Sequence, residues 1–411
     1  MLRRIYLDNS ATTPIAPEVV DAMLPFLRDK FGNASSIHFF GQEARAAVDK
    51  ARHQAAALIN SRPAEIVFTS GGTESNNLAI RGLLESQSQK PDRGGGRYLD
   101  AQGESKRHII TTEIEHPAVK SVCEDLEKLG GYEFTYLPAY ENGVIRVEDL
   151  KNALRDHTVL ISVMMANNEI GTLQPVEEIG RLVKELRSEG RKIWFHTDAV
   201  QAAGKTPVDV EAIGCDLLSM SGHKIYAPKG VGALYVRRGV RLHAQNIGGR
   251  QERGVRGGTE SVPNIVAFGK ACELAAEELN ETANRLGALR DRFEQGVFER
   301  IADVTRNGDV EHRLPNISNL SFSRIEGEGL LINLDMQGVA VSTGSACSSG
   351  SLEPSPVIRA LGRSDELARG AIRFSFGRFN QPEDLDRVLE ILPVSVENLR
   401  KLSPSRAKVI V

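Results

Sequence analysis

Short apolar runs alternate with amphipathic segments from about residue 65 to residue 237, and this alternation limits the fold more than any other feature. In the segment 118–129, apolar residues recur every three or four positions, which is the spacing of one helix face. Strands that alternate with helices form a mainly parallel sheet with helices on both faces. The predicted strands are 65–69, 108–112, 132–137, 158–165, 192–196, 216–220 and 231–236, and the predicted helices are 74–84, 118–129, 147–154 and 176–186.

The pattern changes after about residue 262. A long helical stretch begins there, and its apolar residues share one stripe: Ile265, Phe268, Cys272 and Leu279. We expect a strand near 316–322, a helix near 329–336, a strand at 372–376 and a terminal helix near 383–400. Because 411 residues exceed what one core usually organises, we predict a large α/β domain of residues 15–261 and a smaller α/β domain of residues 1–14 and 262–411. The polar residues 87–107 are predicted to be a solvated loop insertion.

Composition excludes several classes of protein. Hydrophobic residues make up 41% of the chain and charged residues 26%, which is typical of a globular protein. The net charge of -3 favours neither nucleic acid nor a membrane surface as partner, and no apolar run is long enough to span a bilayer. The N-terminus does not have the pattern of a secretory signal. The four cysteines are scattered without a C-x-x-C pair, so we expect a soluble cytoplasmic protein without a metal site.

Two predicted strands end in residues suited to binding a ligand with an aromatic ring and a phosphate group. The segment SGGTESN at 70–76 joins a strand to a helix, where glycines and free N–H groups can hold phosphate; a simple cap by Thr73 is the alternative. Asp198 follows another strand, where it can hold the protonated nitrogen of a pyridoxal ring. It can also be a helix cap, or pair with His196 on a metal, although no third ligand has suitable spacing.

A third strand ends in SMSGHK at 219–224. A lysine at the edge of a sheet can form a Schiff base while neighbouring Ser and His side chains hold a phosphate. A lone lysine is ordinarily a solvated charge. The order of the glycine-threonine turn, Asp198 and Lys224, each at a strand end, favours pyridoxal phosphate as the cofactor.

The chain resembles the NifS/IscS-type cysteine desulfurases, which are class-V aminotransferase-like enzymes with the aspartate-aminotransferase fold. The resemblance covers nearly the whole chain, and its motifs lie at 6–14, 32–38, 69–77, 115–119, 167–175, 248–259, 345–347 and 372–377. It implies that the large domain contains a mainly parallel sheet of the seven-stranded type, flanked by helices. It also implies a homodimer that transfers sulfur from L-cysteine to an acceptor protein such as an iron–sulfur scaffold.

The resemblance assigns roles to residues at matching positions. Lys224 carries the cofactor, His116 stacks on its ring and acts as acid and base, and Asp198 pairs with the ring nitrogen. Gln201 contacts the phenolic oxygen, and Arg373 binds the substrate carboxylate. Asn167, rather than Asn168, is expected to touch the cofactor or substrate. The phosphate is expected to be held by Thr73, Ser221, His223, the backbone of Gly72 and, from the other subunit, Thr259.

Cys347 lies in a segment rich in serine and glycine, 342–351, whose composition does not suit a core. A typical cysteine is a small buried hydrophobe, and this interpretation suits Cys123, Cys215 and Cys272. The resemblance makes Cys347 the nucleophile that receives the sulfur as a persulfide. The expected products are L-alanine and this persulfide, which supplies iron–sulfur cluster assembly or another thiolation.

Some features depart from the family pattern. Ala34 stands where a proline is usual, Arg250 interrupts a glycine triplet, and Gly257 replaces a serine. The end of the chain, 403–411, does not resemble the scaffold-docking tail of the IscS branch, which leaves the acceptor open. Selenocysteine lyase, another pyridoxal-phosphate lyase or an aminotransferase is the nearest alternative activity. A non-catalytic paralogue that acts as a sulfur-transfer scaffold is the other alternative.

Overall fold

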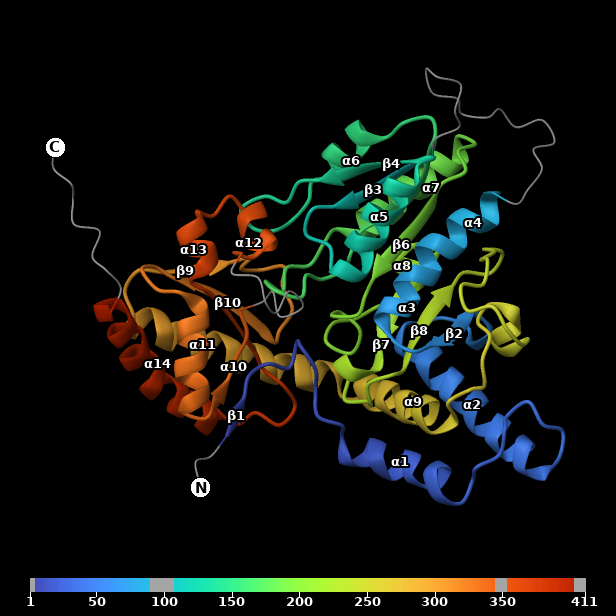
Figure 1. Cartoon of the computed structure of the whole chain (residues 1–411), viewed down its shortest axis with the longest axis horizontal. Helices are drawn as coiled ribbons and strands as arrows, with labels where there is room; N and C mark the ends of the chain where they lie inside the picture. Colours follow the sequence, from blue (N-terminus) through green and yellow to red (C-terminus); the bar gives the residue numbers. More distant parts are fainter. Residues whose placement is uncertain (1–3, 89–106, 344–352, 403–411) are drawn as a thin grey trace.

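The computed structural model describes residues 4–88, 107–343 and 353–402. Its largest sheet has seven strands in the order β2-β8-β7-β6-β5-β3-β4 (Figure 1). Strand β8 is antiparallel to both neighbours, and the other pairs are parallel, as the alternating pattern predicts. The strands are β2 (Ile66–Thr69), β3 (Arg107–Thr112), β4 (Tyr132–Leu137), β5 (Thr158–Ser162), β6 (Trp194–Asp198), β7 (Leu217–Ser221) and β8 (Gly232–Val236).

Both faces of this sheet are buried. Val67, Ile109, Leu160 and Leu217 pack on one face with α3 (Gly72–Asn77), a π-helical segment (Leu78–Gly82), α4 (Leu83–Ser88) and α5 (Pro117–Leu129). The next residue of each strand packs on the other face: Phe68, Ile110, Ile161 and Leu218. That face is covered by α2 (Phe39–Leu58), α6 (Val147–Ala153), α7 (Val176–Ser188), α8 (Val210–Ile213) and α9 (Val262–Glu277), and α1 (Pro17–Arg28) packs beside α9.

A second part of the structure contains two small sheets. Strands β12 (Ala371–Ser375), β10 (Ile317–Phe322) and β9 (Val304–Asn307) form an antiparallel sheet, and β1 (Ile5–Tyr6) pairs in parallel with β11 (Val339–Ala340). Helices α10 (Leu279–Arg300), α11 (Gly327–Met336) and α14 (Pro382–Leu402) surround a separate core with these strands. The short helices α12 (Pro356–Ala360) and α13 (Asp365–Arg369) pack against Ile114 and Met164 of the large-sheet region.

Several predicted elements have different bounds in the structure. The strand predicted at 158–165 ends at Ser162, and the strand predicted at 192–196 lies at 194–198, so Asp198 is its last residue. The long helical stretch breaks at Glu278: Ile265, Phe268 and Cys272 belong to the large core, whereas Leu279 opens α10. The structure also contains α1, α2 and β9, for which the sequence pattern predicts no helix or strand. The domain boundaries stay a prediction.

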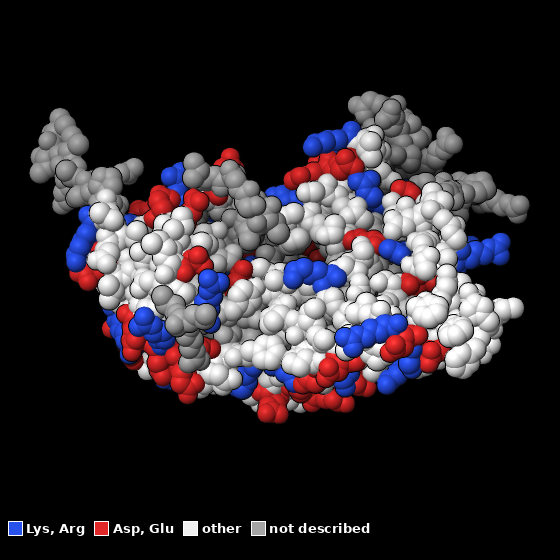
Figure 2. All heavy atoms as spheres, turned by 60° about the horizontal axis from the view of Figure 1, so that its bottom comes forward, with Lys and Arg blue, Asp and Glu red and all other residues white. Residues whose placement is uncertain are grey.

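Two further observations concern the surface. Basic and acidic side chains are interspersed on the face shown in Figure 2. Within the described residues, no helix combines the length and the apolar character that crossing a bilayer requires. Of the insertion predicted at 87–107, residues 89–106 lie outside the described residues.

Candidate active site

A cavity of about 380 Å³ lies at the carboxyl edge of the large sheet, beside the second sheet region. Carboxyl ends of parallel strands are where α/β proteins bind ligands. The cavity brings together most of the predicted site residues from segments far apart in the sequence. The predicted residues that line it are Gly72, Thr73, His116, Asp198, Gln201, Ser221, His223, Lys224 and Arg373.

The turn between β2 and α3 forms one end of the cavity. Gly71 has a φ of 150°, and a Cβ atom on Gly72 would lie 2.8 Å from Cγ2 of Val200. These two glycines therefore let the start of α3 approach Val200 and Ser221 closely. The hydroxyl-bearing residues Thr73 and Ser221 both line this end. Backbone N–H groups at a helix start and nearby hydroxyls form a donor set that suits a phosphate.

Asp198 is fixed by hydrogen bonds to both of its oxygens. Asn76 donates from Nδ2 to Oδ2 at 2.7 Å, and the backbone N–H of Val200 donates to Oδ1 at 2.9 Å. Asp198 is buried. Asn76 also lines the cavity, and the sequence interpretation missed it. Its position three residues after Thr73 is a signal that was available, because residues at this spacing share a helix face.

The N-terminal segment 8–13 lies next to Lys224, and its residues Ser10 and Ala11 line the cavity. The Lys224 ammonium donates to the backbone oxygens of Ser10, at 2.5 Å, and Ala11, at 2.7 Å. Gln201 also donates to the Ser10 oxygen, at 3.0 Å, and Thr12 Oγ1 lies 3.2 Å from Nδ1 of His223. The sequence placed this segment in a family motif but did not predict that it contacts the candidate catalytic lysine.

Two histidines of the cavity are held in their neutral form. His116 caps α5, and its Nδ1 accepts a hydrogen bond from the N–H of Ala118 at 3.1 Å, so Nε2 carries the proton of the neutral ring. Burial, together with the positive charge of Lys224, lowers the pKa of His116 despite the opposing charge of Asp198. Burial, followed by the charges of Lys224 and other lysines, lowers the pKa of His223 to about 4.

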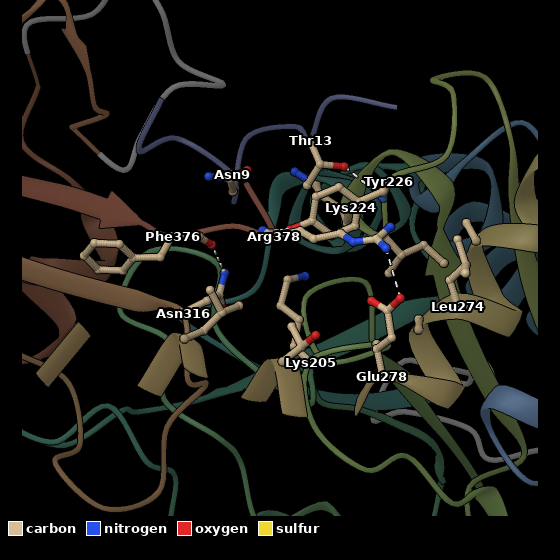
Figure 3. Close-up of a pocket in the computed structure, with 16 residues that line it drawn as sticks. Asn9, Thr13, Lys205, Lys224, Tyr226, Leu274, Glu278, Asn316, Phe376 and Arg378 are labelled. Atoms are coloured by element: carbon tan, nitrogen blue, oxygen red, sulfur yellow. Dashed lines mark hydrogen bonds and ion pairs between the residues drawn. The ribbon is translucent and has the colours of Figure 1, made fainter. Parts of the chain in front are cut away.

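Behind Lys224 lies a second, smaller cavity of about 40 Å³, which contains the side chain of Lys205 (Figure 3). Lys205 is buried and donates from Nζ to the backbone oxygen of Gln201 at 3.1 Å. Burial, followed by the charge of Lys224, lowers its pKa to about 7. The sequence did not single out Lys205, because a lysine after a glycine has no recognisable pattern.

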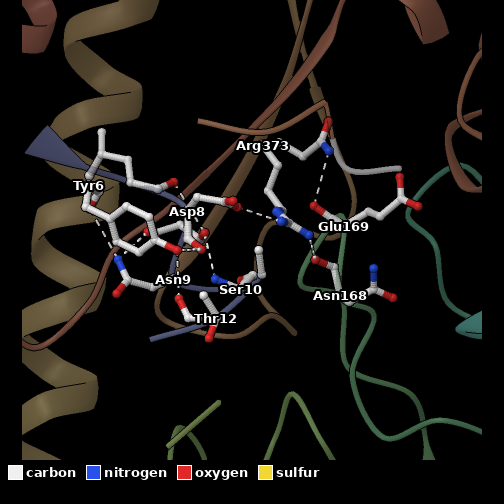
Figure 4. Close-up of polar contacts among 12 residues, drawn as sticks. Tyr6, Asp8, Asn9, Ser10, Thr12, Asn168, Glu169 and Arg373 are labelled. Atoms are coloured by element: carbon white, nitrogen blue, oxygen red, sulfur yellow. Dashed lines mark hydrogen bonds and ion pairs between the residues drawn. The ribbon is translucent and has the colours of Figure 1, made fainter. Parts of the chain in front are cut away.

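Arg373 lies on β12 and faces the cavity from the second sheet region. Its Nη1 donates to the backbone oxygen of Asn168 at 2.8 Å, and its Nη2 donates to Oδ1 of Asp8 at 2.8 Å (Figure 4). Of the two adjacent asparagines, Asn168 lines the cavity. Asn167 is instead buried within its loop, where Nδ2 donates to the Ile114 oxygen and Oδ1 accepts from the N–H of Glu169. The structure therefore brings Asn168 to the site, in place of the predicted Asn167.

The remaining predicted residues are not in this cavity. Thr259 is exposed and does not line it. Cys347 lies outside the described residues. The backbone of Ser342, which precedes Cys347 in the sequence, is hydrogen-bonded to the backbone of Arg373 in both directions. Cys123, Cys215 and Cys272 are free thiols that are fully buried, and burial raises the pKa of each.

Comparisons with a family model, with curated relatives and with solved structures all lead to the same family. The family described as Aminotransferase class-V matches residues 5–388. The chain is 50% identical over 404 residues to the cysteine desulfurase IscS of Dictyoglomus turgidum, covering 98% of this chain and 97% of that protein. It is similar to a solved NifS-like protein with a TM-score of 0.86 and 36% identity, covering 96% of this chain and 100% of the other. It is also similar to a solved structure of SspA in complex with cysteine, with a TM-score of 0.77 and 36% identity, covering 92% and 100%.

Proposed function

The chain belongs to the aminotransferase class-V family and to its cysteine desulfurases, and on that basis we propose that it converts L-cysteine to L-alanine and keeps the sulfur as a persulfide on Cys347. The observation that carries the proposal is the cavity in which Lys224, Asp198, His116 and Arg373 meet. These side chains are a lysine, a fixed carboxylate, a neutral imidazole and a guanidinium. Together they suit chemistry at the Cα atom of an amino acid.

The residues present fit pyridoxal 5'-phosphate. Lys224 would hold its aldehyde carbon, Asp198 its ring nitrogen, and the turn at Gly72 and Thr73 with Ser221 and His223 its phosphate. The Oε1 atom of Gln201 is buried without a hydrogen-bond partner, as expected of a group that meets a polar ligand. When bound, this cofactor supplies an electron sink for the bond that breaks at Cα.

Each protein group then has a task that its geometry supports. Asp198, held by Asn76, would hold the ring nitrogen of the cofactor and favour its protonated form. The amine of Lys224 would serve as the base that takes the proton from Cα of the substrate. The Nδ1 atom of His116 accepts from the Ala118 N–H, which places the proton of the neutral ring on Nε2, and such a ring is suited to exchange a proton with a thiol. Arg373 and Asn168 lie where the substrate's carboxylate would bind.

The sulfur step needs a thiolate. The sulfur of Cys347 attacks the substrate sulfur, a sulfur–sulfur bond forms, and the carbon–sulfur bond breaks with its electron pair left on the substrate carbon, which then takes a proton to give alanine. The other three cysteines are buried, and their raised pKa values disfavour the thiolate that this step requires. This supports Cys347 as the nucleophile.

The same proposal includes a homodimer and an acceptor. Thr259 is exposed and outside the cavity of its own chain, which suits a residue that reaches the phosphate of the other subunit. The apolar side chains of Phe31, Ile37 and Phe39 are 75%, 91% and 72% exposed, and such a group favours burial against a partner. We expect a sulfur acceptor such as an iron–sulfur scaffold and a cytoplasmic location.

Replacing the nucleophile tests the proposal. We expect Cys347→Ser to keep the absorbance of bound pyridoxal phosphate but to form neither alanine nor sulfide from L-cysteine, because serine cannot accept the sulfur. Cys272→Ala, at a buried thiol outside the site, is the matched control and should keep the parent rate. Alanine formation by Cys347→Ser at the parent rate would falsify the assignment. Turnover of alanine with a keto acid would favour an aminotransferase instead.

A further inference from the structure

The guanidinium of Arg373 is ion-paired with a residue from the opposite end of the chain. Arg373 Nη2 lies 2.8 Å from Oδ1 of Asp8, and the side chains are 3% and 19% exposed. The pair is therefore mostly shielded from water, unlike the exposed ion pairs that contribute little to a structure. Figure 4 shows the guanidinium between Asp8 and the loop of Asn168.

The backbone of Asp8 is held close to β12, the strand that carries Arg373. Asp8 forms a parallel bridge with Ser375, two residues along that strand. The N–H of Asn9 donates to the Ser375 oxygen at 3.2 Å, and the N–H of Ser10 donates to its Oγ at 2.9 Å. The hydroxyl of Tyr6 donates to the backbone oxygen of Asp8 at 3.0 Å. Because its backbone is fixed in this way, the Asp8 carboxylate has a defined position.

The two contacts of Arg373 set the direction of its free donors. An arginine stays charged when buried and has five N–H donors in a rigid plane. Asp8 holds Nη2 and the Asn168 oxygen holds Nη1, so the plane of the guanidinium is fixed at two points. The Nε atom is buried without a partner. Donors therefore remain for a further acceptor, and Arg373 lines the cavity where such an acceptor would enter.

We propose that Asp8 is a positioning residue that aims Arg373 at the α-carboxylate of the substrate and so sets the preference for amino acids over amines or amides. The inference rests on the proposed role of Arg373 in substrate binding. Asp8 acts through Arg373. The charge of Asp8 balances the buried cation, and its Oδ1 atom holds the plane of the guanidinium in place. Among the hydrogen bonds that the described residues make to the guanidinium, removal of Asp8 leaves the one to the Asn168 oxygen.

The test measures binding and turnover on the cofactor-loaded enzyme. L-alanine and L-alaninamide, which lacks the carboxylate, are titrated while the cofactor absorbance is followed, and KM and kcat are measured with L-cysteine. We expect Asp8→Ala to raise the Kd of L-alanine and the KM of L-cysteine on the order of tenfold, because a charge-assisted contact is misplaced. The Kd of L-alaninamide and kcat should change by less than about twofold.

Two further variants keep the outcome interpretable. Asp8→Asn keeps an oxygen that can accept from Nη2, and we expect an effect in the same direction but smaller than that of Asp8→Ala. It serves as the test if Asp8→Ala does not fold. Glu18→Gln is the matched control, because Glu18 also pairs with an arginine, Arg378, at 2.9 Å but does not line the cavity. It should bind L-alanine as the parent does.

An unchanged or lower Kd of L-alanine in the Asp8 variants would contradict the proposal. If the Asp8 variants bind L-alanine as tightly as the parent, or more tightly, Asp8 does not position Arg373 and the inference is wrong. Arg373→Ala separates this failure from that of the proposed function. If Arg373→Ala keeps the preference for L-alanine over L-alaninamide, the assignment of Arg373 to the carboxylate is wrong. If it abolishes the preference while the Asp8 variants keep it, only the role of Asp8 is wrong.

Discussion

Lys205 is a buried lysine beside the candidate catalytic lysine, and its burial affects how the stability of the protein depends on pH. Its pKa is lowered to about 7 by burial and by the charge of Lys224. In the unfolded chain a lysine has a pKa of about 10.4. Between these two values the unfolded state binds more protons than the folded state, so this residue makes stability rise with pH from about 7 to about 10.

Lys205→Met removes this titration. Below about pH 7 the parent carries a buried charge that the variant lacks, so the stability of the variant relative to the parent should be greatest there and fall as pH rises towards 10. The measurement is the free energy of unfolding in urea at a series of pH values for both proteins in the same cofactor state. The exposed Lys229→Met is the control for loss of a lysine charge. A difference between Lys205→Met and the parent that does not vary over this range would contradict the expectation.

Some of the predicted site residues lie at or just after the ends of strands in the large sheet, and the carboxyl ends of parallel strands are where α/β proteins bind ligands. Asp198, Lys224 and Thr73 were found in this way, and all three line the cavity. Asn167 and Asn168 are adjacent, so spacing does not decide which side chain faces the cavity; a turn that uses the Asn167 side chain decides it. The contacts of Asp8 with Arg373 join residues 365 positions apart, which local patterns do not report.

At the scale of elements, the turn from β2 into α3 determines how closely the sheet and helix meet at the end of the cavity where we propose that the phosphate binds. A Cβ atom on Gly72 would lie 2.8 Å from Val200 Cγ2 and 3.6 Å from Ser221 Cβ. Val200 follows Asp198, and its N–H donates to that carboxylate. A side chain on Gly72 is therefore expected to disturb both the proposed phosphate site and the proposed site of the ring nitrogen at Asp198.

Gly72→Ala should weaken pyridoxal phosphate binding. We expect its Kd to rise by about five- to 150-fold, because Val200 must move and overpacking of this kind costs about 1–3 kcal/mol. Fluorescence titration of the cofactor-free protein measures this. Gly287→Ala is the matched control: Gly287 lies in α10, and the nearest atom to its added Cβ is Cβ of Pro315 at 4.0 Å. Equal affinity of the Gly72→Ala variant and the parent would show that α3 tolerates the displacement.

Most elements of the large sheet were predictable because strands buried on both faces read as short apolar runs. The order of those strands in the sheet was not predictable, since it depends on contacts between segments far apart in the chain. The antiparallel β8 is an example: like the parallel strands of the sheet it is a short apolar run, and only its pairing with β2 and β7 shows that its direction is reversed. The helices α1 and α2 were missed although they pack against α9.

On the scale of the whole molecule, the candidate site is a meeting of three parts of the chain. The large sheet contributes the residues around Asp198 and Lys224, the second sheet region contributes Arg373, and the segment 8–13 lies between them. Residues from one part alone would provide a place for a cofactor without a place for the carboxylate of a substrate. The resemblance to a family predicted that Arg373 joins Lys224 and Asp198 in one site, and strand and helix patterns predicted only the part from the large sheet. Neither predicted that the segment 8–13 contributes to the site.

Transfer of sulfur from L-cysteine to Cys347 is the central claim, and the mass of the protein tests it most directly. The cofactor-loaded enzyme is mixed with L-cysteine, the reaction is stopped with a thiol-blocking reagent, and digested peptides are analysed by mass spectrometry while alanine is measured. We expect the peptide with Cys347 to gain one sulfur atom as alanine forms, and the peptides with Cys123, Cys215 and Cys272 to gain none. Alanine formation without added sulfur on Cys347, or sulfur on a buried cysteine instead, would contradict the account.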